Sequence, residues 1–180
     1  SFSDIRELAA GLRIKSILKQ LTSHSWFAVR GLLFDKTAEA NWQVRWHQDQ
    51  TVAVREQKET PGFAGWSKKE GVIHGQASVE VLAKMIAVRI HLDAADAENG
   101  ALQVISGSHR SGRVSPADRD RFKAENPQVV CVAGPGDALL MRPLLLHRSS
   151  KAIRPKHRRV LHLEYSCAEL PGDLEWYWWL

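Results

Sequence analysis

The stretch Lys84-Met85-Ile86-Ala87-Val88-Arg89-Ile90-His91-Leu92 gives the clearest indication of the fold class. Its residues alternate, with Ile86, Val88, Ile90 and Leu92 on one face, which is typical of a half-buried strand. Similar short runs, separated by turn residues, predict further strands at 26–34, 42–46, 100–105, 129–132, 138–141 and 159–165. Many short strands with few helices indicate a mainly β protein of the sandwich or jelly-roll kind.

Helices are expected in only three places. Residues 3–21 form a rough helical stripe of Ile5, Leu8, Leu12, Ile17 and Leu21, although Gly11 interrupts it. Shorter helices are expected at residues 78–83 and after Ser115-Pro116, where serine can cap and proline can begin a helix. Residues 55–77 contain four glycines and Pro61, so we interpret them as a long mobile loop that covers the substrate.

Length and composition indicate a single globular domain. The chain has 180 residues, of which 44% are hydrophobic and 25% charged. We expect one domain over 1–180, with a helical segment at 1–25, a jelly-roll core at 26–166 and a tryptophan-rich tail at 167–180. We see neither a membrane-spanning run nor a signal peptide, and two distant cysteines are no disulfide framework, so a cytoplasmic location is the default.

His47 and Asp49 are two residues apart, so on a strand both side chains point to the same side. With the distant His147 they offer two imidazoles and one carboxylate, the facial set that suits ferrous iron and leaves its other face open. Arg158 follows His147 by eleven residues and is placed to bind a carboxylate through two hydrogen bonds, while Ser149 shares the face of His147. The pattern predicts an oxygenase that uses iron and an oxo-acid.

Three segments resemble the phytanoyl-CoA dioxygenase family. Asn41-Trp42-Gln43-Val44-Arg45-Trp46-His47-Gln48-Asp49 looks like its first metal motif. The central segment is similar in His91-Leu92-Asp93, Asn99-Gly100-Ala101-Leu102 and Gly107-Ser108-His109. The second-histidine segment is similar in Gly136-Asp137, His147-Arg148-Ser149 and Arg158-Arg159-Val160-Leu161-His162-Leu163-Glu164-Tyr165. The resemblance covers about residues 26–166.

The resemblance implies a double-stranded β-helix, the cupin-like jelly roll, and a dioxygenase that uses Fe(II), 2-oxoglutarate and O2. It implies that His47, Asp49 and His147 bind iron and that Arg158, helped by Ser149, binds 2-oxoglutarate. Because halogenating relatives lack the carboxylate ligand, the presence of Asp49 favours hydroxylation of a small organic molecule, with release of succinate and CO2.

Several alternatives stay open at this point. The chain could be an inactive metal-binding jelly roll that acts as a small-molecule sensor or binding module. Nucleic-acid binding is suggested only by the sequence pI near 9.4, and the basic residues are scattered, so we expect a small-molecule partner, with no nucleic acid and no membrane. Among single residues, Arg159 competes with Arg158, Arg30 or Lys36 could contact 2-oxoglutarate, and Arg89 and Gln103 could line the site. His91 is expected to be structural.

Overall fold

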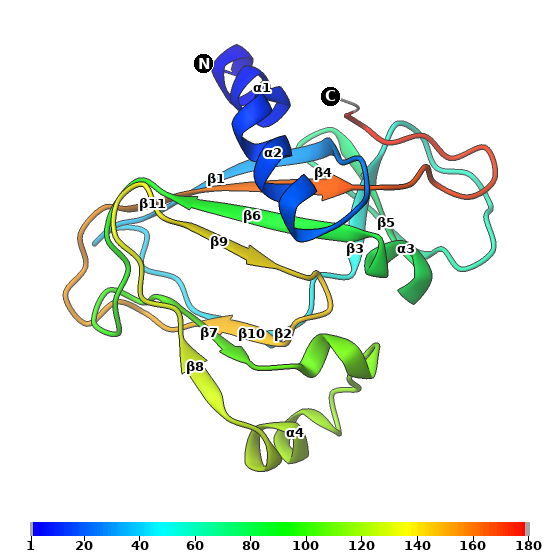
Figure 1. Ribbon diagram of the computed structural model, residues 1–180. Coiled ribbons are helices and arrows are strands. Elements are labelled where there is room, and N and C mark those ends of the chain that lie inside the picture. The colour runs from blue at the N-terminus through cyan, green and yellow to red at the C-terminus, as the bar shows by residue number, and fades with distance from the viewer. Residues whose placement is uncertain (1, 179–180) are drawn as a thin grey trace. The chain divides into compact units, whose positions relative to one another are not determined.

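The computed structural model describes residues 2–178, so Trp179 of the predicted tail lies outside the described part, as does the side chain of Phe2 (Figure 1). In chain order the elements are α1 (Phe2–Ala10), α2 (Leu12–Leu21), β1 (Phe27–Lys36), β2 (Val44–His47), β3 (Thr51–Val54), β4 (Ala64–Lys69), β5 (Val72–Gln76), α3 (Val79–Ala83), β6 (Met85–His91), β7 (Leu102–Ile105), the 3-10 helix η1 (Ser108–Ser111), α4 (Arg119–Glu125), β8 (Gln128–Val130), β9 (Ala138–Met141), β10 (His147–Ser149) and β11 (Arg158–Ser166). The prediction of a mainly β fold is confirmed.

The chain divides into two compact units. The first contains 1–32, 50–87 and 163–180, and the second contains 33–49 and 88–162. The sheet with strand order β1-β11-β6-β9 contains three strands that run along the chain from one unit into the other. The division therefore does not decide whether 1–180 is one domain, and that stays a prediction.

The second unit contains a whole antiparallel sheet with strand order β2-β10-β7-β8 (Figure 1). Its neighbouring strands are distant in sequence, as a jelly roll requires. His147 of β10 lies opposite His47 on one side and opposite Val104 on the other. Trp46, Ile105 and Leu146 form a buried apolar cluster, against which Phe122 of α4 packs. This packing fixes β2 beside β10, the pair of strands that carries both predicted histidine ligands.

The first unit corrects the predicted N-terminal helix. Residues 3–21 form two helices, because Gly11 adopts an extended conformation between α1 and α2. The predicted stripe is also wrong: Leu8, Leu12, Ile17 and Leu21 are exposed, whereas Ala9, Ile14 and Leu18 are buried. The Tyr165 hydroxyl of β11 donates to the Ala9 carbonyl oxygen at 2.9 Å, which ties α1 to a buried part of the same unit.

The prediction that residues 55–77 form a long loop is wrong. β4 and β5 form a hairpin that joins β3 in a three-stranded antiparallel sheet. Its turn, Glu70-Gly71, has positive φ at both residues, 49° and 85°, which is the two-residue hairpin turn that matches strand twist. The tryptophan-rich tail is packed in the same unit, where Trp176 is buried and bridges Val54.

The predicted faces of β6 are wrong at its C-terminal end. Leu92, placed by its alternation among the buried residues, is 45% exposed, whereas Arg89 and His91 are buried. Helix α4 begins at Arg119, later than Pro116 predicted, and the Ser115 hydroxyl instead bonds Asp118. The short helix after Ser78 is confirmed, with the Ser78 hydroxyl accepting from Val81 N.

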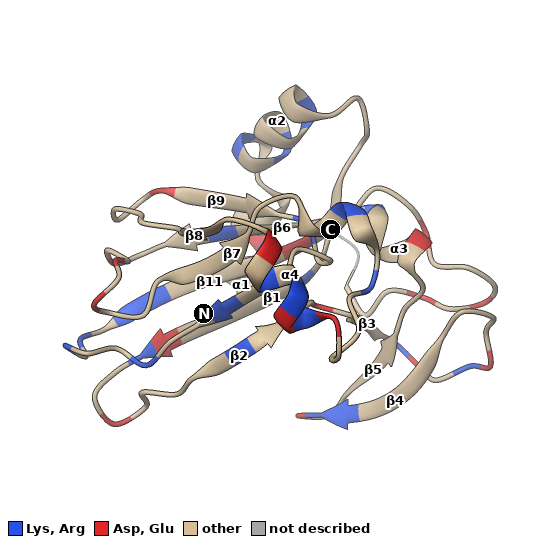
Figure 2. Cartoon of the chain, turned by 90° about the horizontal axis from the view of Figure 1, so that it is seen from below, with Lys and Arg blue, Asp and Glu red and all other residues tan. Residues whose placement is uncertain are grey.

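Within residues 2–178, no helix combines the length and apolar character needed to span a membrane. Lysines and arginines occur on β2, β4 and α4, elements of both units, rather than on one element (Figure 2).

Candidate metal centre

His47, Asp49 and His147 converge in the second unit, and one ligand atom of each lies within 4.8 Å of those of the other two. The Nε2 atom of His47 is 3.5 Å from Asp49 Oδ1, and that of His147 is 3.7 Å from Asp49 Oδ2. Ligands held at right angles and about 2.1 Å from an ion stand roughly 3 Å apart, so a small contraction would close this group around one. Two imidazoles and a carboxylate are also the right donor set for a facially bound ferrous ion.

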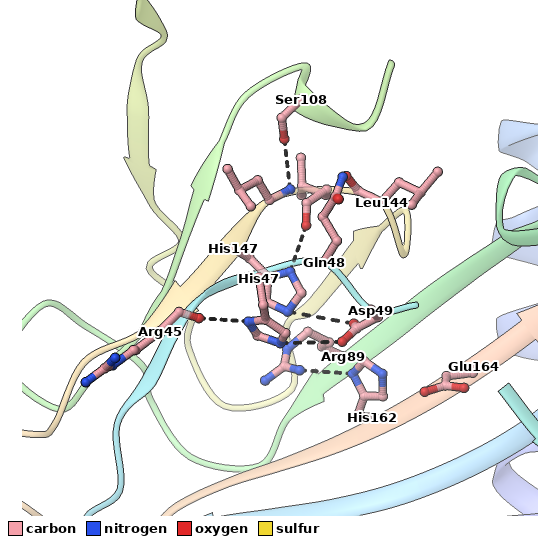
Figure 3. A network of polar contacts seen from close by, with 12 residues as sticks. Arg45, His47, Gln48, Asp49, Arg89, Ser108, Leu144, His147, His162 and Glu164 are labelled. Carbon is pink, nitrogen blue, oxygen red and sulfur yellow. Dashed lines mark hydrogen bonds and ion pairs between the residues drawn. The ribbon is translucent and has the colours of Figure 1, made fainter. Parts of the chain in front are cut away.

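Backbone contacts orient both imidazoles toward the same point. The Nδ1 atom of His47 lies 2.9 Å from the Arg45 carbonyl oxygen, and that of His147 lies 2.7 Å from the Leu145 carbonyl oxygen. A carbonyl can only accept, so each Nδ1 carries the proton and each Nε2 keeps a free lone pair, as metal-ligating histidines require. Figure 3 shows the three side chains pointing toward one another.

Gln48 holds the motif in place, although it points away from the two ligands that flank it. Its amide nitrogen donates to the carbonyl oxygens of Gly112 and Leu144 at 2.8 and 2.7 Å, and its oxygen accepts from Val114 N at 2.8 Å. The backbone of Asp49 is fixed as well, because its N–H donates to the Pro143 carbonyl oxygen at 2.9 Å.

The protonation states of His147 and Asp49 favour metal binding, whereas the raised pKa of His47 opposes it. Burial lowers the pKa of His147 to about 4, so this imidazole is neutral at pH 7. Burial alone would raise the pKa of Asp49, but the hydrogen bond from His47 and the nearby histidines hold the pKa of its carboxyl well below the usual range. Burial alone would lower the pKa of His47, yet the Asp49 carboxylate raises it above the ordinary value. Asp49 is therefore ionised and supplies a negative charge that a metal cation would neutralise.

A second group of side chains in this unit is positively charged. Arg158 and Lys36 are buried, at 3% and 0% exposed, and the charge of Arg158 contributes to lowering the pKa of Lys36. The Lys36 ammonium donates to Ser149 Oγ at 3.0 Å and to the Ser150 carbonyl oxygen at 2.6 Å. The Ser149 hydroxyl directs its single proton to the Gly100 carbonyl oxygen at 2.8 Å. Arg158, Ser149 and Lys36 thus form one buried cationic group, within the same unit as His147.

The neighbouring Arg159 is different. It is exposed and forms a two-pronged contact with the Asp93 carboxylate, with both nitrogen–oxygen distances at 2.8 Å. Adjacent strand residues face opposite ways, so Arg158 points inward and Arg159 outward. Arg30 lies in the other unit, where it pairs with Glu164 at 3.3 Å. Gln103 accepts from Arg148 Nε at 2.7 Å. His74 is buried in the first unit.

The family model for phytanoyl-CoA dioxygenase matches residues 8–160, most of the chain. The chain belongs to the phytanoyl-CoA dioxygenase family. No curated protein matches it. Its fold is similar to that of several solved structures: AviO1 from Streptomyces viridochromogenes Tue57 shares 19% identity at a TM-score of 0.65 over 92% of this chain. The carbocyclase SnoK from nogalamycin biosynthesis shares 17% at 0.66 over 93%. EctD from S. alaskensis, solved with 2-oxoglutarate and 5-hydroxyectoine, shares 20% at 0.64 over 89%.

The matched part is 62% of AviO1, 61% of SnoK and 51% of EctD, so this chain spans less than two thirds of these relatives. Together with the family match, these similarities confirm the predicted cupin-like jelly roll as the fold of this family member.

For Gln48, strand alternation in the sequence predicts only that the side chain turns away from His47 and Asp49. Its clamp could not be foreseen, because its three backbone partners lie 64 to 96 residues further along the chain.

Proposed function

We propose that this member of the phytanoyl-CoA dioxygenase family is an Fe(II)- and 2-oxoglutarate-dependent dioxygenase that hydroxylates a small organic molecule and releases succinate and CO2. The observation that carries the proposal is the convergence of His47, Asp49 and His147. His47 and Asp49 are partly exposed, with side-chain exposures of 36% and 35%, so this group of side chains is not sealed from solvent.

The bound ion and its co-substrate would supply the oxidation of the substrate, and the protein would hold and shield them. His47, Asp49 and His147 would hold the ion through the two Nε2 atoms and one carboxylate oxygen. Their backbone-anchored imidazoles need no reorientation on binding, which keeps the loss of side-chain entropy small.

Arg158 would bind the far carboxylate of 2-oxoglutarate, and we add Lys36 as a second cation for it, because both side chains are buried and the charge of Arg158 acts on Lys36. Two buried cations without a carboxylate partner are costly, because desolvation of charge is unfavourable unless an opposite charge is nearby. A dicarboxylate would offset that cost. The assignment of Ser149 to the same carboxylate takes a modified form: with its proton on Gly100 O, Ser149 would act by orienting the Lys36 ammonium.

The test is succinate formation from 2-oxoglutarate by the purified protein with Fe(II) and O2, measured with and without candidate substrates. Asp49→Ala and His47→Ala should abolish succinate release and lower the amount of metal retained after dialysis. Asp93→Ala is the matched control, because Asp93 also follows a histidine by two residues but pairs with Arg159. The inactive-sensor alternative is not favoured by an intact ligand set, and it would be accepted if iron and 2-oxoglutarate bound without any succinate appearing.

A further inference from the structure

Arg89 and His91 share one face of β6 and are almost fully buried, at 7% and 1% exposed. The next residue, Leu92, is 45% exposed. This end of the strand therefore buries two polar side chains and exposes an apolar one, the opposite of what stability alone favours. Local rules are broken in this way mainly at functional sites.

The direct contacts of the Arg89 guanidinium are with neutral groups, although the charges of Asp49 and Arg158 also act on it. Its Nη1 donates to Nδ1 of His162 at 2.9 Å, and because arginine has no lone pair to offer, that imidazole nitrogen must accept. The centre of the guanidinium lies 5.6 Å from the ring centroid of Phe34, and its Nε has no hydrogen-bond partner. None of these contacts carries negative charge.

His91 adds a second unsatisfied group beside Arg89. Neither of its ring nitrogens has a hydrogen-bond partner. Burial, and then the charges of Arg89 and Arg158, lower its pKa, so the imidazole is neutral at pH 7 and offers one N–H donor. Nε of Arg89 and the N–H of His91 are therefore two hydrogen-bond donors without an acceptor. Because Arg89 is charged, its strongest acceptor would be an anion.

The balance of buried charges around the proposed metal ligands also indicates that an anion binds there. Lys36, Arg89 and Arg158 are buried, and among the described residues none of them pairs with a carboxylate. With the single carboxylate of Asp49, these three cations leave a net charge of +2. A divalent ion and a doubly charged 2-oxoglutarate cancel each other, so the charge of +2 persists after both have bound.

From this we infer that Arg89, assisted by His91, binds a carboxylate of the substrate, and that the substrate class is therefore small organic acids. The inference rests on the proposed function, because Arg158 and Lys36 are taken to hold the far carboxylate of 2-oxoglutarate. Arg89 is then the buried cation left for another anion. Its guanidinium contacts His162 (Figure 3) and interacts electrostatically with Asp49 and His147, two of the three proposed metal ligands, so it lies in the neighbourhood where a substrate has to lie to be oxidised.

His162 is a positioning residue in this arrangement. Its ring packs edge-on against Phe34, with centroids 5.8 Å apart, while its Nδ1 holds one arm of Arg89. The remaining nitrogens of the guanidinium are thereby kept free for a ligand, since only Nη1 is engaged. A two-pronged contact with a carboxylate needs two such nitrogens in a fixed plane.

The experiment uses acetate as the simplest carboxylate probe and acetamide, of the same shape but neutral, as its control. The protein is loaded with Co(II) and saturated with 2-oxoglutarate, and the visible absorption of Co(II) is followed during titration at constant ionic strength. We expect a saturable change with acetate and none with acetamide. Arg89→Gln should weaken acetate binding at least about tenfold, because it removes the charge of a buried contact. Arg89→Lys should fall between, and Arg159→Gln, at an exposed position, should match the wild type.

Binding of 2-oxoglutarate to the Co(II) protein is measured separately by calorimetry. Equal responses to acetate and acetamide, or an Arg89→Gln variant with unchanged acetate affinity, would overturn the inference while leaving the proposed function intact. So would an Arg89→Gln variant that loses affinity for 2-oxoglutarate in place of acetate, since Arg89 would then belong to the co-substrate. Failure of the wild-type protein to bind 2-oxoglutarate would instead overturn the proposed function, and this inference with it.

Discussion

The affinity for 2-oxoglutarate should fall as the pH is raised from 7 to 9, because Lys36 loses its proton in that range. Burial, and then the charge of Arg158, lower the pKa of Lys36 to about 8. A carboxylate bound beside the ammonium stabilises its charged form and raises this pKa again. Binding above pH 8 therefore requires the uptake of a proton, which weakens it.

The sign and size follow from linkage. A group whose pKa is raised in the complex contributes its full share of binding below the pKa of the free protein, and the contribution is lost as the pH rises above it. With a pKa of about 8, roughly nine tenths of the free protein carries the Lys36 ammonium at pH 7 and about one tenth carries it at pH 9. The dissociation constant should thus rise about tenfold, or about 1.4 kcal/mol, over this interval.

The assay is calorimetric titration of the Zn(II)-loaded protein with 2-oxoglutarate at pH 7, 8 and 9, where both carboxylates of the ligand stay ionised. Lys36→Met should bind 2-oxoglutarate more weakly at pH 7, and its affinity should not fall further at higher pH, because it lacks the ammonium that loses a proton. Lys36→Arg keeps its charge throughout, so its affinity should also stay level. Lys151→Met, at an exposed position of the same unit, should follow the wild type.

An equal loss of affinity in the wild type and in Lys36→Met would refute the reasoning, because the titrating group would then lie elsewhere. An affinity that rises with pH would refute it as well.

Three further predictions concern single side chains. Arg158→Gln should weaken 2-oxoglutarate binding at least about tenfold in the same calorimetric assay, while Arg159→Gln should not, since Arg159 is exposed and paired with Asp93; the reverse order would make Arg159 the anchor. Gln48→Ala removes three hydrogen bonds to backbone groups and should lower the free energy of unfolding by about 3 kcal/mol in urea titrations. The control Gln43→Ala, at an exposed position, should lower it by less than about 0.5 kcal/mol. Equal losses of stability in the two variants would show that the hydrogen bonds of Gln48 contribute nothing. Gly100→Ala would place a methyl group 2.5 Å from the Ser150 carbonyl oxygen and 3.0 Å from Lys36 Nζ, so it should destabilise the protein and weaken 2-oxoglutarate binding. The control Gly107→Ala has nearly the same φ, 79° against 78°, but open space around it, so it should cost only the backbone contribution of about 1 kcal/mol. Similar effects of the two substitutions would exclude the steric explanation.

The sequence predicts the convergence of the proposed metal ligands because the arrangement within the first motif is local. Strand periodicity alone puts His47 and Asp49 on one side. The same alternation puts Arg158 and Arg159 on opposite sides of their strand. What it does not supply is the partner of β2: His147 lies opposite His47 only because two strands a hundred residues apart along the chain are neighbours. The family resemblance fills that gap.

The error at residues 55–77 has a physical cause. Glycines in this stretch favour a loop by composition, but Gly75 lies within β5, under the ring of Trp66 from β4. A Cβ atom at Gly75 would come within 2.6 Å of that ring, so glycine is what lets the two strands pair. Gly71 supplies the positive φ of the hairpin turn. Composition alone does not separate glycines that pack under an aromatic ring from glycines of a mobile segment.

The sequence leaves the roles of Lys36 and Arg89 open, because the burial of a strand face depends on what covers it. At Arg89 the apolar alternation pointed to the wrong face, since Leu92 is the exposed residue and Arg89 the buried one. The burial of Arg89 together with the exposure of Leu92 is itself informative. A buried guanidinium costs several kcal/mol unless an anion accompanies it, and a leucine that stays 45% exposed forgoes part of the roughly 1.5–3 kcal/mol that full burial provides. Two departures in the same direction at one end of a strand are hard to explain by stability. Ligand-binding residues make both departures understandable, because the anion that would offset the cost arrives with the substrate.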